Sequence, residues 1–252
     1  MKIIILILFL FSIIFADTKK IYFYTTENNI NNFKVLKVSF DTYLRDYGDY
    51  EFQPFNDIKT FEKYIHNKDS FVILSSWHYE KIAAQYNLEA KLVAEKEKTI
   101  TDTKILVGIK DLSLTGVVTS AYDDEYTREL LLTLTKNNSE NLSVLIVPKE
   151  IDALMSVSFG MSKFAIVSRD SLRLLKKINP LLTKNLKIYS ESIPAYRILV
   201  ACNKIDKDKL KLMSIFENMD LTDNGKNILG MIGIDKLVIL NSNDLKNLGD
   251  VK

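Results

Sequence analysis

Cysteine and histidine are nearly missing from this chain of 252 residues. Its single cysteine, Cys202, excludes an intramolecular disulfide, so packing alone must hold the fold together. Cys202 lies in an apolar stretch and is predicted to be a buried strand residue rather than a nucleophile. The two histidines, His66 and His78, fall on different predicted helices with no cysteine or acid at ligand spacing, which argues against a metal site.

Enzyme signatures are missing as well. The chain has no G-x-S-x-G turn, no phosphate loop with G-K-[ST] and no G-x-G-x-x-G turn. A nucleophile also needs an oriented base and a third group, and the sequence offers no such set, so we expect neither catalysis nor a cofactor. The net charge is only +2, with lysines spread along the chain, which gives no reason to expect a nucleic-acid partner.

The N-terminus carries a long apolar run. Met1-Lys2 precedes the apolar segment 3–15, and Ala16-Asp17 follows it, a pattern typical of a secretory signal peptide spanning residues 1–16. The run is too short to span a bilayer comfortably, although an uncleaved anchor is the alternative. No cysteine follows for lipid attachment. We therefore expect cleavage after Ala16 and an exported, soluble, periplasmic protein.

The stretch from Phe71 to Ala84 has the strongest local pattern. Residues 71–74 are an unbroken apolar run, which predicts a short strand buried on both faces. Ser75 or Ser76 then caps a helix that begins near Trp77. A strand that turns directly into a helix places backbone N–H groups, hydroxyls and the positive end of a helix dipole at one sheet edge. Small anions bind well at such a position.

Two more turns of this kind follow. Thr119-Ser120 ends a predicted strand before a helix that opens at Asp123, and Ser168-Arg169-Asp170 ends another. Strands and helices alternate along the chain, which predicts an α/β protein with mostly parallel sheets, closed by helices near 207–219 and 223–232. Each hydroxyl pair alone is explained by helix capping. Three of them favour a cleft at which the turns face each other.

Several short motifs, taken in their order and spacing, carry a family resemblance. They are Val72 to Tyr79, Lys110-Asp111-Leu112 before Thr119-Ser120, Asp152-Ala153-Leu154 leading through Val167 to Asp170, Ser190-Glu191-Ser192-Ile193-Pro194, and Gly225-Lys226-Asn227-Ile228-Leu229. With these motifs the chain resembles the phosphonate- and phosphate-type periplasmic substrate-binding proteins, which are two-lobed receptors for small anions. The resemblance covers nearly all of the mature chain.

This resemblance implies a two-lobed type II periplasmic-binding-protein fold of the α/β class, with mixed sheets flanked by helices and a cleft between the lobes. Residues 17–109 together with 197–252 would form lobe one, and residues 110–196 would form lobe two, joined by two crossing strands. The candidate ligand-binding residues are Tyr24, Thr25, Ser75, Ser76, Trp77, His78, Thr119, Ser120, Tyr122, Ser168, Arg169 and Asp170.

The resemblance also implies a function. The protein would clasp a small oxyanion, such as phosphonate or phosphate, and deliver it as a monomer to the membrane permease of an ABC importer. A sensory module that signals to a membrane partner is the alternative. Where the family commonly has a glycine-containing turn, this chain has residues 119–122, followed by acids at 123–125. These acids complement the helix dipole and would also repel a dianion. Arg169 is either a two-pronged contact to an anion or a solvated surface residue.

Overall fold

The computed structural model describes residues 18–26, 30, 32–65, 70–109, 113–203 and 205–249. The predicted signal peptide (1–16), His66 and the first residues of the predicted lobe two (110–112) lie outside these ranges. The strands are β1 (Lys19–Tyr24), β2 (Tyr50–Pro54), β3 (Phe71–Leu74), β4 (Glu89–Glu95), β5 (Thr101–Asp102), β6 (Lys104–Ile109), β7 (Gly116–Ser120), β8 (Leu142–Ile146), β9 (Phe164–Ser168), β10 (Leu186–Glu191), β11 (Ala195–Tyr196), β12 (Leu199–Cys202) and β13 (Lys236–Ile239). The helices are α2 (Phe33–Leu44), α3 (Ile58–Tyr64), α4 (Ser76–Tyr86), α5 (Asp124–Thr135), α6 (Glu150–Ser158), α7 (Arg169–Ile178), α8 (Pro180–Thr183), α9 (Lys207–Glu217), the 3-10 helix η1 (Met219–Leu221), α10 (Asp223–Met231) and α11 (Ser242–Gly249).

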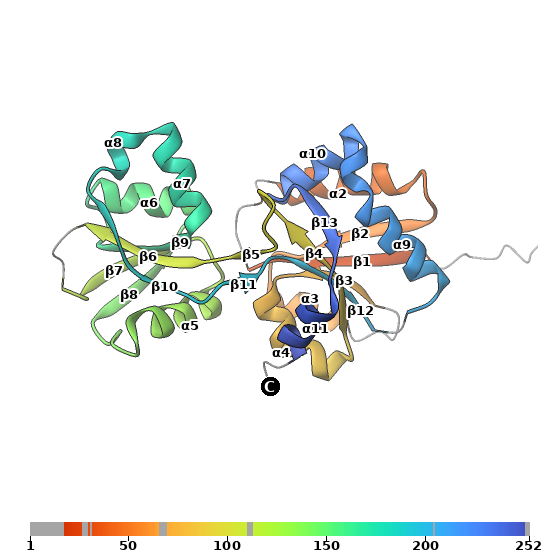
Figure 1. Ribbon diagram of the computed structural model, residues 1–252, viewed down its shortest axis with the longest axis horizontal. Coiled ribbons are helices and arrows are strands. Elements are labelled where there is room, and N and C mark those ends of the chain that lie inside the picture. Colours follow the sequence, from red (N-terminus) through yellow and green to blue (C-terminus); the bar gives the residue numbers. More distant parts are fainter. Residues whose placement is uncertain are drawn as a thin grey trace, which may run out of the picture.

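Two sheets form two lobes (Figure 1). The first lobe contains the sheet β13-β4-β12-β3-β1-β2, and the second lobe contains the sheet β10-β6-β9-β7-β8. In the first sheet β1 pairs in parallel with β2 and β3, whereas β12 runs antiparallel to β3 and β4. In the second sheet β7 pairs in parallel with β8 and β9, whereas β6 runs antiparallel to β9. The same strand order therefore recurs in both lobes.

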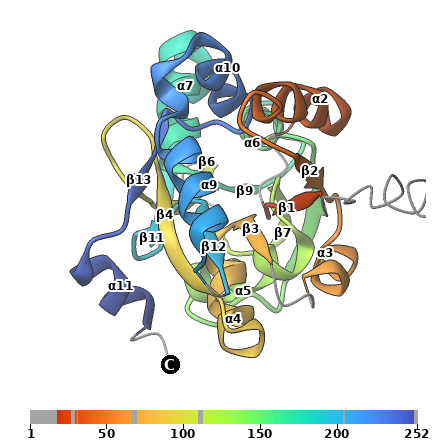
Figure 2. The same cartoon turned by 90° about the vertical axis from the view of Figure 1, so that its right-hand side faces the viewer.

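Each sheet is buried on both faces, which explains the apolar runs in the sequence. On β1, Ile21 and Phe23 belong to the core under α2, α9 and α10, whereas Tyr22 and Tyr24 belong to the core on the side of α3, α4 and α11. Figure 2 shows these helices on either side of the first sheet. In the second lobe α5 covers one face, and α6 and α7 cover the other. Alternate side chains of a strand point to opposite faces, so both must be apolar.

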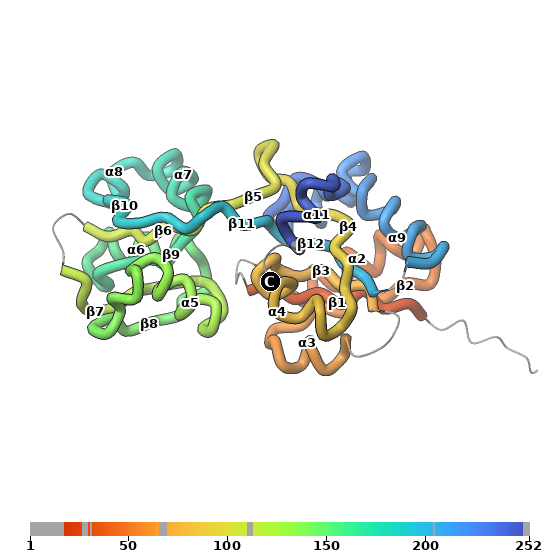
Figure 3. Tube along the Cα trace, turned by 60° about the horizontal axis from the view of Figure 1, so that its bottom comes forward, coloured from red at the N-terminus to blue at the C-terminus, as the bar shows by residue number. Residues whose placement is uncertain are grey.

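Two chain segments cross between the lobes. The first passes from β4 through β5 to β6, and the second returns from β10 through β11 to β12. Between the sheets, β5 and β11 pair antiparallel, with Ala195 opposite Asp102 and Tyr196 opposite Thr101. Figure 3 shows both segments running side by side from one lobe to the other. A short two-stranded connection of this kind lets two lobes move as bodies about a hinge.

The structure differs from the sequence-based prediction mainly at the C-terminus. The predicted helices near 207–219 and 223–232 are present as α9 and α10, but β13 and α11 follow them and were not predicted. Strand β13 pairs antiparallel with β4 at the edge of the first sheet. After α7, Pro180 begins the one-turn helix α8, where its fixed φ suits the first helical position.

Candidate functional site

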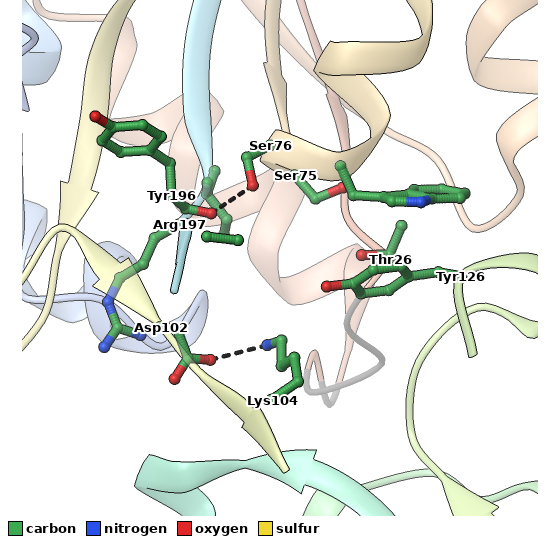
Figure 4. A pocket seen from close by; sticks show the side chains of 11 residues that line it. Thr26, Ser75, Ser76, Asp102, Lys104, Tyr126, Tyr196 and Arg197 are labelled. Carbon is green, nitrogen blue, oxygen red and sulfur yellow. Dashed lines mark hydrogen bonds and ion pairs between the residues drawn. The ribbon is translucent and has the colours of Figure 1, made fainter. Parts of the chain in front are cut away.

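A pocket lies between the lobes, next to the crossing strands (Figure 4). It encloses about 340 Å³ when its mouth, which opens to solvent, is included. Both lobes and both crossing segments contribute to its wall, which consists of Thr26, Ser75, Ser76, Trp77, Asp102, Lys104, Tyr126, Ala195, Tyr196, Arg197 and Ile198. Its position at the junction of two lobes is one at which small-molecule sites are often found.

The start of α4 forms the floor of the pocket and is uncapped. Ser75 occupies the N-cap position with extended backbone angles, but its side chain makes no capping hydrogen bond. A serine at this position ordinarily accepts a hydrogen bond from one of the first N–H groups of the helix. In the part of the chain that the structure describes, Ser75 Oγ has no partner at all, although the residue is only 8% exposed. The first turn of α4 is therefore available to an outside acceptor.

A second unpartnered hydroxyl lies in the same pocket. Thr26 follows β1 and is 1% exposed, and its Oγ1 also lacks a partner among the described residues. Buried hydroxyls are rarely left without a hydrogen bond, because the missing bond costs about 1–3 kcal/mol. Ser76, by contrast, uses its hydroxyl to donate to the carbonyl oxygen of Tyr196 at 2.5 Å. Thr26 and Ser75 are thus the pocket residues with a buried hydroxyl that has no hydrogen-bond partner among the described residues.

The charged side chains of the pocket are paired. Lys104 Nζ lies 2.9 Å from Asp102 Oδ2, and Arg197 Nη2 lies 2.8 Å from Asp170 Oδ2. Burial alone would raise the pKa of the Asp170 carboxyl, but the hydrogen bond and charge of Arg197, together with Arg173, hold that pKa below its ordinary value. Asp170 therefore stays ionised and fixes the Arg197 guanidinium at the edge of the pocket.

The lobes touch each other beside the pocket through α4 and α5, which we call the α4–α5 contact. The rings of Trp77 and Tyr126 lie 4.9 Å apart, and Trp77 Nε1 donates to Glu129 Oε2 at 2.6 Å. Lys81 Nζ pairs with Glu125 at 2.7 Å and with Glu129 at 2.5 Å. These contacts join the first lobe to the second beside the pocket.

A further link between the lobes lies at the end of β1. The backbone N–H of Asp123 donates to the carbonyl oxygen of Thr26 at 2.8 Å, and Tyr24 OH donates to Asp123 Oδ2 at 3.2 Å. Burial, followed by the negative charge of Asp123, raises the pKa of the Tyr24 phenol well above its usual range. Tyr24 therefore remains protonated and acts here as a hydrogen-bond donor. Asp123, predicted to open the helix, is indeed the N-cap of α5 and accepts from Glu125 N–H.

Of the predicted ligand-binding residues in the first lobe, three line the pocket: Ser75, Ser76 and Trp77. Tyr24, Thr25 and His78 are buried and do not line it. His78 Nε2 lies 2.8 Å from Glu62 Oε1, and its ring packs edge-on against Tyr24. Burial lowers the pKa of His78, so the imidazole is neutral at neutral pH.

The predicted hydroxyl residues of the second lobe are used inside that lobe. Thr119 Oγ1 donates to backbone carbonyl oxygens at 3.2 Å, and Ser120 Oγ accepts from the hydroxyl of Thr127 at 3.1 Å. Ser168 and Tyr122 both donate to the buried carboxylate of Glu150. None of these predicted residues lines the pocket described above. Their polar groups are satisfied by partners within the second lobe: backbone carbonyl oxygens for Thr119, Thr127 for Ser120, and Glu150 for Tyr122 and Ser168.

Arg169 and Asp170 also serve the protein itself. The guanidinium of Arg169 forms an ion pair with Glu191, and both side chains are more than 40% exposed. Asp170 holds Arg197 in place but is not itself part of the pocket wall. Sequence reasoning missed Thr26, Asp102, Lys104, Tyr126 and Arg197 as pocket residues. Most of them lie on or beside the crossing strands, and no local pattern in the sequence marks that position.

Within the described residues, no group of three or more histidine, cysteine or acidic side chains is arranged to hold a metal ion. Over the same part of the chain, no helix combines the length and the apolar character needed to cross a membrane.

Solved structures of other proteins share this architecture. XAC2383 from Xanthomonas citri, bound to ATP, is 12% identical with a TM-score of 0.68, and the match covers 92% of this chain and 95% of that one. A binding-protein component of an ABC phosphonate transporter from Pseudomonas aeruginosa is 14% identical with a TM-score of 0.64, covering 93% and 86%. PhnD1 from Prochlorococcus marinus, in complex with methylphosphonate, is 14% identical with a TM-score of 0.63, covering 92% and 96%.

No family model and no curated protein matches the sequence. At these identities the structural likeness establishes the fold. The predicted fold class is confirmed: the chain is an α/β protein with two mixed sheets flanked by helices, built like the periplasmic binding proteins it resembles. The predicted resemblance to phosphonate-transporter binding proteins holds at the level of structure.

Proposed function

We propose that this protein is a solute receptor that clasps a small oxyanion between its two lobes and delivers it to the permease of an ABC importer. The observation that carries the proposal is the pair of buried, unpartnered hydroxyls of Ser75 and Thr26 in the interlobe pocket. Together with the start of α4, which has no capping hydrogen bond from Ser75, they would supply hydrogen-bond donors to an acceptor in the pocket. An acidic group is the ligand that such a set of donors binds best.

The mechanism is closure about the crossing strands. Each lobe is a rigid body with its own buried core, and β5 and β11 are the short connection between them. A ligand at the start of α4 touches the first lobe, while Tyr126 in the pocket wall belongs to the second. The ligand therefore has contacts in the closed state that it lacks in the open one, and this difference shifts the population toward closure.

The similarity to structures of phosphonate-transporter components supports the transport role. In this proposal the receptor is exported, works in the periplasm as a monomer, needs no cofactor and catalyses no reaction. Signalling to a membrane sensor would use the same clamp, but no observation favours it. Loss of uptake of the bound solute in cells that lack the protein would distinguish transport from signalling.

The site is tested with Ser75→Ala and Thr26→Val, measured by calorimetry with phosphate, methylphosphonate, alkyl sulfonates and simple carboxylates. A lost hydrogen bond to a charged group costs about 1.5–3 kcal/mol, so each variant should weaken binding about 10- to 150-fold. Ser143→Ala removes an exposed hydroxyl of β8, far from the pocket wall, and serves as the matched control. If the original protein binds none of these anions, or if both variants bind as it does, the proposed site is wrong.

A further inference from the structure

The pocket has little net positive charge to offer a ligand. Its two cations, Lys104 and Arg197, are each held by a carboxylate of the protein, Asp102 at 2.9 Å and Asp170 at 2.8 Å. All four side chains are at most 12% exposed, so solvent screens these pairs weakly. Each cation is therefore already neutralised before a ligand arrives.

A third carboxylate acts on the same lysine. Glu150 is buried at the start of α6, and the charge of Lys104 is the main influence that counteracts the effect of burial on its pKa. Glu150 accepts hydrogen bonds from the N–H and hydroxyl of Ser168, which is the N-cap of α7. The start of α7 in the second lobe therefore binds the negatively charged carboxylate of Glu150 and not an outside anion.

The remaining attraction comes from the first lobe alone. The N-terminus of a helix is equivalent to about half of a positive charge, and the hydroxyls of Ser75 and Thr26 add donors without charge. On the far side of Thr26 lies another acid, Asp123, whose backbone N–H bonds to the Thr26 carbonyl oxygen. A ligand with two negative charges would meet the Asp102 carboxylate in the pocket wall, and three more acids, Asp170, Glu150 and Asp123, interact with wall residues. The described pocket wall offers it no unpaired cation.

We infer that the site takes an acidic group with a single negative charge, such as a carboxylate, a sulfonate or a singly protonated phosphonate, and discriminates against a dianion. This inference rests on the proposed function and narrows its ligand class. Two features therefore select the ligand. The hydrogen-bond donors at the start of α4 favour an acidic group, and the pairing of Lys104 and Arg197 with carboxylates limits that group to one negative charge.

Two tetrahedral probes of matched shape separate these effects. Methyl phosphate loses its second proton with a pKa of about 6, whereas methyl sulfate carries one charge throughout. Calorimetric titrations at pH 5 and pH 8 are therefore compared. The titratable residues that line the pocket are Asp102, Lys104, Tyr126, Tyr196 and Arg197, and three further acids, Glu150, Asp170 and Asp123, interact with lining residues. Methyl sulfate reports any change in the protein itself.

At pH 8 only about 1% of methyl phosphate is singly charged, so its apparent affinity should fall about 100-fold from pH 5 while that of methyl sulfate stays constant. Asp102→Asn removes one negative charge beside Lys104. In this variant the affinity for methyl phosphate should fall less between pH 5 and pH 8. Equal or tighter binding of methyl phosphate at pH 8 would overturn the inference but leave the proposed function standing. Binding of neither probe at either pH would overturn both.

Discussion

The buried carboxylate of Glu150 gives the sharpest test of how the second lobe is built. Its Oε1 accepts hydrogen bonds from Tyr122 OH and, at 2.5 Å, from the backbone N–H of Ser168. Its Oε2 accepts from Ser168 Oγ at 2.9 Å and from Ser171 Oγ. One side chain thus joins the starts of α6 and α7 and the segment between β7 and α5. The change Glu150→Gln should therefore destabilise this lobe.

The size of the effect follows from this geometry. Glutamine keeps the shape of the side chain, but its amide NH2 group faces hydroxyl and N–H donors and leaves them unsatisfied. Breaking a buried, hydrogen-bonded charge network costs about 3–5 kcal/mol, which is a large part of the 5–15 kcal/mol typical of a folded domain. Asp152→Asn is the matched control, because Asp152 is an exposed acid in the first turn of the same helix.

Urea unfolding followed by far-ultraviolet circular dichroism measures this difference, since the signal reports both lobes. The pH dependence gives an independent check. Burial alone would raise the pKa of Glu150, but Lys104 and the hydrogen-bond donors lower it below its ordinary value. The folded protein therefore binds this proton less readily than the unfolded chain, in which the pKa is about 4.3.

The stabilisation by Glu150 is accordingly complete above about pH 5 and is lost as the pH falls through the lower, folded pKa. The gap between the original protein and Glu150→Gln should be constant from pH 8 to pH 5 and should narrow below that. If the free energy of unfolding of Glu150→Gln lies within about 1 kcal/mol of that of the Asp152→Asn control, the argument is refuted, because surface substitutions alone cause differences of up to about 0.5 kcal/mol. A gap that widens in acid would refute its electrostatic part.

Three further expectations concern binding and closure. Emission of Trp77, the sole tryptophan, should shift to the blue on ligand binding, because its indole lies in the pocket wall against the second lobe; saturable binding with unchanged emission would contradict this placement. Arg197→Ala should weaken anion binding about tenfold or more, because it leaves the Asp170 carboxylate without its partner beside the pocket, where its charge repels an anion. Arg169→Ala should leave binding unchanged, because Arg169 pairs with exposed Glu191 and does not line the pocket. Calorimetry of the two variants decides, and equal losses would be inconsistent with the site. Lys81→Met removes two exposed interlobe ion pairs, each of which contributes about 0.2–1 kcal/mol. Small-angle scattering of the ligand-free variant should therefore show a larger mean radius of gyration. An unchanged profile would mean that the α4–α5 contact does not favour closure.

The sequence predicted the parts of the fold that local chemistry determines. The apolar run at 71–74 became β3, with Ser75 at the N-cap of α4, because both patterns are complete within a few neighbouring residues. The order of strands and helices likewise indicated two α/β lobes. The pocket could not be found in this way. Asp102 and Tyr196 lie on two-residue strands that have no periodicity of their own and exist only because the two crossing segments pair with each other.

Glu150 illustrates a different limit. An acid in the first turn of a helix is ordinarily a surface residue that complements the helix dipole, and nothing in the sequence separates Glu150 from exposed Asp152 in the same turn. What separates them is which side of α6 faces the sheet and α7. Helical periodicity places Glu150 three positions before Ala153 and four before Leu154, on the buried face. That signal existed but was masked by the expectation that buried positions are apolar.

The contrast between the two helix starts bears on how such sites are recognised. Ser75 and Ser168 each follow a buried strand and occupy the N-cap of a helix, so their sequences are equivalent by capping rules. Ser168 accepts from Ser171 N–H and donates to Glu150, whereas Ser75 has no partner among the described residues. The two serines are therefore alike in sequence context and differ in whether the protein itself supplies a hydrogen-bond partner. The cleft is therefore asymmetric, because the start of α7 is bonded to the carboxylate of Glu150 whereas the start of α4 has no such partner among the described residues. Such a receptor should hold the acidic group of its ligand against the first lobe and use the second lobe to close over the rest of it.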